Sequence, residues 1–161
     1  MPTVTADLSV MKGETSLELY RYWEGLRKGR DMPACDDFAM MDIYKIAPYL
    51  IMLDVVRGGD GSIRHLYRYV GTKIVEYRRK RGMTAPDHTG QFVDEASRYY
   101  SPESIANSYA QCTEEGTPLL AYGTFKTDVK VDLHERLSLP LGDGKGSVQR
   151  LAVCVYRPKD L

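Results

Sequence analysis

A chain of 161 residues is long enough for one domain with a modest hydrophobic core, and an apolar content of 43% argues against global disorder. Lysine and arginine number 22, as do aspartate and glutamate, so the balanced charge gives no general argument for binding nucleic acid or an anionic membrane. Three cysteines without C-x-x-C spacing argue against a disulfide framework, a zinc site or another metal centre. No apolar run reaches the ~20 residues that span a bilayer, and no signal peptide is evident, so we expect a cytoplasmic protein.

The N-terminal part is expected to contain a loose tail, residues 1–13, and an amphipathic helix over residues 17–26. Apolar side chains recur along that helix at i, i+3, i+4 and i+7, and they are Leu19, Tyr22, Trp23 and Leu26. Such a stripe either covers the core of its own domain or pairs two subunits. We carry the second alternative forward as a prediction: a homodimer that uses this stripe, because an isolated amphipathic helix must bury its apolar face.

A β-hairpin followed by a helix is predicted next. Residues 49–57 and 63–70 are rich in branched and aromatic residues, and the glycine-rich turn 58–61 joins them. At Gly71 the strand pattern gives way to helical spacing, because glycine lets the backbone bend sharply and the hydroxyl of Thr72 suits a helix N-cap. The helix is expected to end near residue 81.

The densest charge in the chain is Arg78-Arg79-Lys80-Arg81, at the end of that helix. At about 100° per residue, four consecutive cations surround a helix rather than forming one face, and cations at a C-terminus favour the helix dipole. We therefore expect exposed side chains, and replacing Arg78 and Arg79 by alanine should leave stability nearly unchanged. The alternative is a contact with phosphate or an acidic partner, which would make the protein a nucleic-acid binder with tyrosines as stacking platforms.

The second half of the chain is predicted to contain a short helix, a long helix and three strands. The short helix covers residues 91–99, and the long one runs from Pro102 to Glu115 after an N-cap at Ser101. The strands are predicted over residues 119–125, 133–141 and 148–157. Within each of the last two strands, apolar residues alternate with a second set of side chains. This order predicts an antiparallel sheet with a helical block across one face, and it contains no catalytic constellation.

The pattern resembles a PAS domain, and more narrowly the bacterial PAS_5 family of single-domain proteins. The resemblance depends on the order and spacing of individually weak motifs, which are Tyr20–Arg27, Leu50–Val55, Tyr67–Thr72 with Val75-Glu76, Asp87–Gly90 and Glu135–Leu141. It implies an α+β fold, in which a five-stranded antiparallel sheet carries helices on one face and an N-terminal amphipathic helix precedes it. It also implies two parts: residues 1–45 as tail and interface helix, and residues 46–158 as the PAS domain.

The same resemblance implies a non-catalytic sensory or regulatory module that acts in signalling through protein–protein contacts, with gating by a small ligand left open. Haem-binding PAS domains use a histidine on the long helix, and residues 102–115 contain none. Flavin-binding photosensors carry an Asn-Cys-Arg motif, which is absent. Haem and flavin are therefore disfavoured, and the cofactor is unknown. The cluster Arg78–Arg81 lies in an apparent insertion relative to the family, so no role for it is inherited.

PAS ligands lie between the concave sheet face and the helices, and the resemblance places six candidate ligand-binding residues there: Tyr69, Tyr77, Tyr109, Tyr122, Phe125 and Arg136. Aromatic walls suit a flat or apolar ligand, and a buried arginine suits a carboxylate or phosphate. The alternative is that these side chains only fill the core, with Arg136 on the other face of the sheet. A further alternative is an enzyme on a cone-shaped, ketosteroid-isomerase-like scaffold, although no inward carboxylate can be assigned for it.

Overall fold

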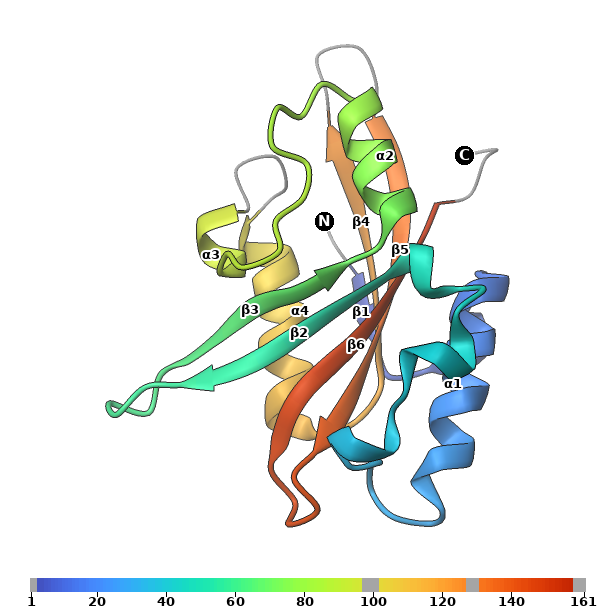
Figure 1. The fold of residues 1–161 in the computed structure, drawn as a ribbon, viewed down its shortest axis with the longest axis vertical. Helices are drawn as coiled ribbons and strands as arrows, with labels where there is room; N and C mark the ends of the chain where they lie inside the picture. Colours follow the sequence, from blue (N-terminus) through green and yellow to red (C-terminus); the bar gives the residue numbers. More distant parts are fainter. Residues whose placement is uncertain (1–2, 97–101, 127–130, 158–161) are drawn as a thin grey trace.

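The computed structural model describes residues 3–96, 102–126 and 131–157, with side chains for residues 4–96, 106–124 and 133–157. One antiparallel sheet organises the chain, and its strands lie in the order β1-β4-β5-β6-β2-β3 (Figure 1). The strands are β1 (Thr3–Thr5), β2 (Leu50–Arg57), β3 (Ile63–Val70), β4 (Leu119–Lys126), β5 (Val131–Gly142) and β6 (Val148–Tyr156). The helices are α1 (Glu14–Arg27), α2 (Thr72–Lys80), α3 (Val93–Ala96) and α4 (Pro102–Glu115), with short 3-10 helices η1 (Leu8–Val10), η2 (Cys35–Asp37), η3 (Met40–Ile43) and η4 (Ala47–Tyr49). None of the described helices is both long and apolar enough to cross a membrane.

The predicted α+β fold with an antiparallel sheet is confirmed, and the five predicted strands match β2 to β6. A sixth strand, β1, was not predicted. Residues 3–5 were expected to belong to a loose tail, and they pair with β4 instead. The N-cap predicted at Ser101 and the end of the predicted helix 91–99 lie outside the described residues.

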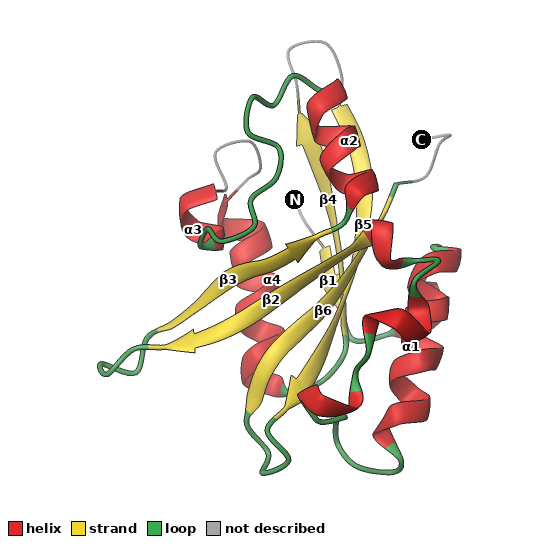
Figure 2. Cartoon of the chain, in the orientation of Figure 1, coloured by secondary structure: helices red, strands yellow, loops and turns green. Residues whose placement is uncertain are grey.

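Helices cover both faces of the sheet (Figure 2). On the face that we call inner, Ile74 of α2, Val93 of α3 and Tyr109 of α4 belong to one core with the strands. On the opposite, outer face, α1 and η3 contribute Leu19 and Ile43 to a second core. A central strand that is covered on both faces needs apolar residues on both, which explains the nearly continuous apolar sequence of β6.

Helix α1 does not present its apolar stripe to a partner. Leu19 and Trp23 are 0% and 2% exposed, and the indole Nε1 of Trp23 donates a hydrogen bond to the carbonyl of Pro140 in β5 (2.8 Å). Tyr22 and Leu26 are half-buried, and the ring of Tyr22 meets Phe38 edge-on. The prediction that this stripe forms a dimer interface is therefore wrong, because the chain's own sheet occupies it.

The N-terminal segment also belongs to the domain rather than preceding it. The buried carboxylate of Glu135 in β5 accepts hydrogen bonds from the backbone N–H groups of Lys12 and Gly13, directly before α1, and from the hydroxyl of Tyr122 in β4. An anion at a helix N-terminus also interacts favourably with the helix dipole. Since β1 and α1 are both part of the packed domain, a boundary between residues 45 and 46 does not separate two bodies.

The corner between β3 and α2 forms where it was predicted, but for a different reason. Gly71 itself is the N-cap of α2, it makes no side-chain cap bond, and its φ of −63° is open to any residue. Its N–H donates to the carbonyl of Leu50 (2.8 Å), and a Cβ at this position would overlap the backbone carbonyl of Pro48. Glycine is thus required for close approach to η4 rather than for bending, and the N-cap role predicted for Thr72 is wrong.

Candidate functional site

Seven polar side chains are buried together on the inner face, which is an unusual content for a core. We call them the inner polar cluster, and they are His65, Arg78, His88, Tyr109, Thr113, His134 and Arg136. Strand alternation places His134 and Arg136 on this face, opposite to the leucines of β5 that pack against α1. The face that Arg136 takes, left open by the sequence, is therefore the inner one.

Arg136 is held by the long helix. It is 2% exposed, and its Nη1 donates to the hydroxyl of Tyr109 in α4 (2.7 Å). The ring of Tyr109 is fully buried and lies 5.9 Å, centroid to centroid, from the imidazole of His65. A guanidinium in such a place can bind a carboxylate or phosphate through two parallel hydrogen bonds.

The hydrogen bonds between β3 and α4 fix the protonation of His65. Thr113 donates its hydroxyl proton to the carbonyl of Tyr109 (2.9 Å), so His65 Nε2 must be the donor in its contact with Thr113 Oγ1 (2.9 Å). Burial, with a smaller effect of Arg57, lowers the pKa of His65 to about 4. The imidazole is therefore neutral at pH 7.

Arg78 was predicted to be an exposed cation, and this prediction is wrong, because its side chain is 0% exposed. It extends inward from the last turn of α2, where Nη1 donates to the carbonyl of Pro86 (3.2 Å) and to Nδ1 of His88 (3.2 Å). A guanidinium can only donate, so Nδ1 of His88 is an acceptor and the imidazole is neutral. Burial and the charge of Arg78 lower the pKa of His88 to about 4.

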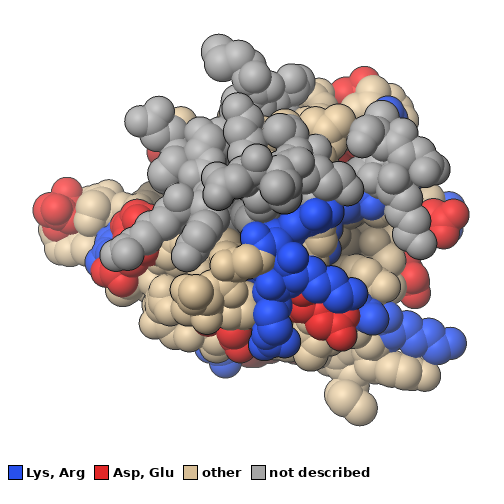
Figure 3. Space-filling model, turned by 90° about the horizontal axis from the view of Figure 1, so that it is seen from above, with Lys and Arg blue, Asp and Glu red and all other residues tan. Residues whose placement is uncertain are grey.

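Two of the three remaining basic residues at the end of α2 are exposed as predicted, whereas Arg81 is half-buried with its guanidinium over the ring of Tyr77. Arg79 and Lys80 are exposed, and Figure 3 shows lysine and arginine side chains gathered on the face seen from above, where α2 lies. The surface therefore presents fewer cations than the four that the sequence suggested.

His134 lies among the arginines of the cluster. Burial lowers the pKa of His134 to about 2, and the charges of Arg136, Arg157 and Arg78 act in the same direction. The positive charges of all three arginines therefore disfavour the protonated form of His134.

We predict that Arg78→Ala and Arg79→Ala have very different effects on stability. Removing the buried Arg78 leaves a cavity and breaks its bonds to Pro86 and His88, which should cost about 2–3 kcal/mol of unfolding free energy. Arg79→Ala removes an exposed charge and should change it by less than about 0.5 kcal/mol. Urea denaturation of both variants measures the difference, and equal stabilities would contradict the assigned burial.

The six predicted ligand-binding residues are not brought together. Tyr109 and Arg136 meet on the inner face. Tyr77 lies at the end of α2, with the guanidinium of Arg157 over its ring at 3.4 Å. The side chain of Phe125 lies outside the described residues.

Tyr69 and Tyr122 lie on the outer face, so the prediction that they share an inner cavity is wrong. Tyr69 donates to the carbonyl of Ala47, and Tyr122 donates to Glu135 (2.8 Å). Their register partners, Met52 and Glu135, face the same way. The sequence analysis did not include the three buried histidines or Arg78 among the site residues. For Arg78 a signal was present, because its i, i+4 spacing from Ile74 places both on one helix face.

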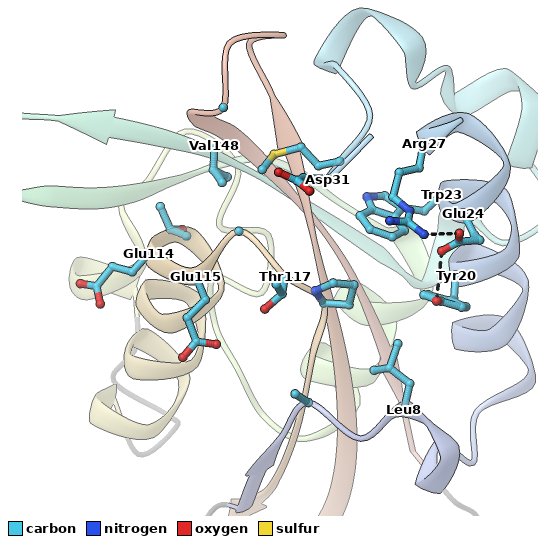
Figure 4. A pocket seen from close by; sticks show the side chains of 16 residues that line it. Leu8, Tyr20, Trp23, Glu24, Arg27, Asp31, Glu114, Glu115, Thr117 and Val148 are labelled. Carbon is cyan, nitrogen blue, oxygen red and sulfur yellow. Dashed lines mark hydrogen bonds and ion pairs between the residues drawn. The ribbon is translucent and has the colours of Figure 1, made fainter. Parts of the chain in front are cut away.

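A groove of about 630 Å³ lies at the other end of the molecule, between α1 and the C-terminal end of α4 (Figure 4). The rings of Tyr20 and Trp23 form one wall with Glu24, whose carboxylate accepts from Tyr20 and pairs with Arg27 (2.6 Å). Thr117 and the acidic end of α4 form the opposite wall. Its lining holds four carboxylates, from Glu24, Asp31, Glu114 and Glu115, against one guanidinium, so its charge disfavours an anionic ligand.

No protein-family model matches the chain, and no curated protein matches it. Among solved structures, a light-oxygen-voltage domain studied with a flavin analogue matches with a TM-score of 0.51 and 11% identity, over 77% of this chain and 87% of that one. Light-oxygen-voltage domains are members of the PAS superfamily. The fold is that of a PAS domain. Membership of the PAS_5 family is not confirmed.

Two further matches have lower scores. An RNA-binding light-oxygen-voltage receptor gives a TM-score of 0.49 at 12% identity, and the match covers 73% of this chain but only 32% of the receptor. The light-state structure of the light-oxygen-voltage domain of Aureochrome1 gives 0.46 at 8% identity, over 76% of this chain and 91% of that domain.

The prediction that flavin is disfavoured is contradicted by the match with a TM-score of 0.51, because the PAS fold found here is shared with that domain, which was studied with a flavin analogue. The absence of an Asn-Cys-Arg motif was the reason for that prediction, and one motif does not decide what a fold can hold. The prediction against haem is untested.

The inner face holds buried side chains of the types that bind a flavin nucleotide. The guanidinium groups of Arg78 and Arg136 suit its phosphate, and the buried rings of Tyr67 and Tyr109 suit its flat ring system. The cysteine on α4 does not fit a reactive role: burial raises the pKa of the Cys112 thiol to about 12, and its Sγ faces the backbone carbonyls of Thr117 and Ser138.

Proposed function

We propose that this protein is a non-catalytic sensory or regulatory PAS module, which binds a small molecule at the inner polar cluster and passes the signal to another protein. The observation that carries the proposal is the burial of Arg136 and its hydrogen bond to Tyr109, in a domain of the PAS fold. A buried, hydrogen-bonded ion is seldom more stable than well-packed apolar side chains of the same volume. Its presence in the core therefore favours a binding role.

The ligand class that the cluster supports best is a flat molecule with a carboxylate or phosphate group, and a flavin nucleotide is one member of that class. The guanidinium of Arg136 would bind the anionic group, and Tyr109 would orient that guanidinium. The neutral imidazole of His65, whose Nε2 donates to Thr113, can still accept a hydrogen bond from such a ligand through Nδ1.

The two alternative functions receive less support. An isomerase-like enzyme needs a carboxylate or tyrosine in an apolar pocket, and the one buried carboxylate among the described side chains, Glu135, lies on the outer face. Nucleic-acid binding through Arg78–Arg81 loses one of its four cations, because Arg78 is buried. A homodimer stays a prediction, and it would need a surface other than the stripe on α1. The three free cysteines agree with a cytoplasmic protein.

Thermal unfolding in the presence of small carboxylates, phosphates and flavin mononucleotide tests the proposal. A ligand that binds only the folded protein raises its unfolding temperature. We expect at least one of these compounds to raise the unfolding temperature. Arg136→Met should weaken the binding of an anionic ligand by about tenfold or more, because a charged hydrogen bond is lost. Arg21→Met, which removes an exposed arginine of α1, is the matched control and should bind normally.

Two results would count against parts of this proposal. If a stabilising anion binds Arg136→Met as tightly as the unaltered protein, the role of Arg136 is wrong. If no compound raises the unfolding temperature, the sensing function fails and only a protein-interaction module remains.

A further inference from the structure

A second groove, of about 410 Å³, lies on the outer face between η3 and the end of the sheet formed by β2, β3 and β6. We call it the outer groove. The side chains that matter for the following inference are Phe38, Met40, Met41, Tyr44, Arg68 and Arg150. It is separated from the inner polar cluster by the thickness of the sheet.

The apolar wall of the outer groove is exposed to an unusual degree. Met41 is 80% exposed and Tyr44 is 62% exposed, the two highest values among the exposed large apolar residues of the described chain. Phe38 and Met40 beside them are only half-buried. Methionine side chains are flexible and polarizable, which suits a surface that must fit an apolar side chain of another molecule.

The other wall is positively charged. Asp54 in β2 accepts from Arg68 (3.2 Å) and from Arg150 (2.9 Å), so two guanidinium groups share one carboxylate and leave a net positive charge. The side chain of Arg68 is 56% exposed, and its remaining donors are accessible from the groove. Asp42 lies within η3, but its carboxylate accepts from Tyr22 and is not part of the groove lining.

We infer that the outer groove binds a segment of another protein that presents a large apolar side chain next to an aspartate or glutamate. The apolar side chain would fill the space between Met41, Tyr44 and Phe38, and the carboxylate would meet Arg68 and Arg150. Exposed apolar area beside complementary charge is the usual composition of such contacts. A symmetric contact with a second copy is disfavoured, because it would bring the arginines of two copies together.

Selection from a random library of 12-residue peptides displayed on phage, with the full chain as bait, tests this inference. We expect enriched peptides that carry an aromatic or large aliphatic residue within four positions of an aspartate or glutamate. A synthetic peptide of the enriched sequence should bind Met41→Ala about tenfold more weakly, because Met41 is the most exposed large apolar side chain of the groove lining. Since Met41 is so exposed, this variant should fold normally, and its unfolding temperature checks that.

Charge reversal makes the test specific. Arg68→Glu should weaken binding of the acidic peptide by at least about tenfold. The same variant should bind a peptide in which lysine replaces the acidic residue more tightly than the unaltered chain does. Arg79→Glu, which reverses an exposed charge on α2 away from the groove, is the matched control and should leave both affinities unchanged.

Three outcomes would overturn the inference. In the first, the selection enriches no sequence. In the second, the enriched peptides bind Arg68→Glu and Met41→Ala as tightly as the unaltered chain. In the third, sedimentation shows a concentration-dependent dimer that Met41→Asp abolishes. The last outcome would assign the outer groove to a second copy of the chain. None of them depends on whether the inner polar cluster binds a ligand.

Discussion

Lowering the pH from 7 to 5 should remove about 3–5 kcal/mol of unfolding free energy. The folded-state pKa values of His65 and His88 are lowered to about 4, and that of His134 to about 2, from an ordinary value of 6.5. A group with a lowered folded-state pKa contributes stability above its unfolded pKa and loses it as the pH falls toward the folded value. The loss should therefore begin near pH 6.5 and continue to about pH 4 for His65 and His88 and to about pH 2 for His134. At pH 5, unfolding should take up roughly two to three protons.

Urea denaturation at pH 7 and pH 5, at constant ionic strength, measures this loss. His88→Asn is the informative variant, because its amide oxygen can still accept from Arg78 but cannot be protonated. It should reduce the loss between the two pH values by about a third. Equal stability of the unaltered protein at both pH values would show that the three imidazoles are not buried in neutral form.

Gly71→Ala should destabilise the protein by about 3 kcal/mol or more. The added methyl group would overlap the backbone carbonyl of Pro48 and lie close to that of Ala47, and neither atom is the end of a flexible side chain that could move away. Overpacking of a rigid site usually costs about 1–3 kcal/mol and more when the backbone must shift. Because Gly71 also donates to the carbonyl of Leu50, a backbone shift at Gly71 would disturb the start of β2.

Gly25→Ala is the matched control for this substitution. Gly25 lies within α1, and nothing stands within 4 Å of an added Cβ. Alanine has the higher helix propensity, so this variant should gain about 0.5–1 kcal/mol. A Gly71→Ala variant as stable as Gly25→Ala would contradict the close approach of η4 to the start of α2.

Local patterns were sufficient to predict most of the sheet. Alternation in residues 133–141 and 148–157, together with the branched and aromatic residues on either side of the glycine-rich turn 58–61, identified the strands within a residue or two. The pattern could not tell the two faces apart, because α1 covers the outer face and both sides of β5 and β6 are therefore buried. The same fact explains why the stripe on α1 was assigned to a dimer.

Contacts between distant parts of the chain were not predictable in this way. The bonds from Glu135 to the start of α1 join residues more than 120 positions apart, and the pairing of β1 with β4 is of the same kind. Arg78 was taken for a surface cation because its neighbours in sequence are basic, whereas its position four residues after the buried Ile74 decides its direction. Two of the six predicted ligand-binding residues meet, namely Tyr109 and Arg136.

Native mass spectrometry tests most directly whether the inner polar cluster binds a small molecule. The protein, freshly purified and then incubated with the small-molecule fraction of a cell extract, should carry a mass in excess of the 18.2 kDa chain that is released on denaturation. The excess should be lost from Arg136→Met and retained by Arg21→Met, because only the first of these arginines is buried beside Tyr109. A bare chain under all these conditions, or an excess that Arg136→Met retains in full, would contradict the proposed site.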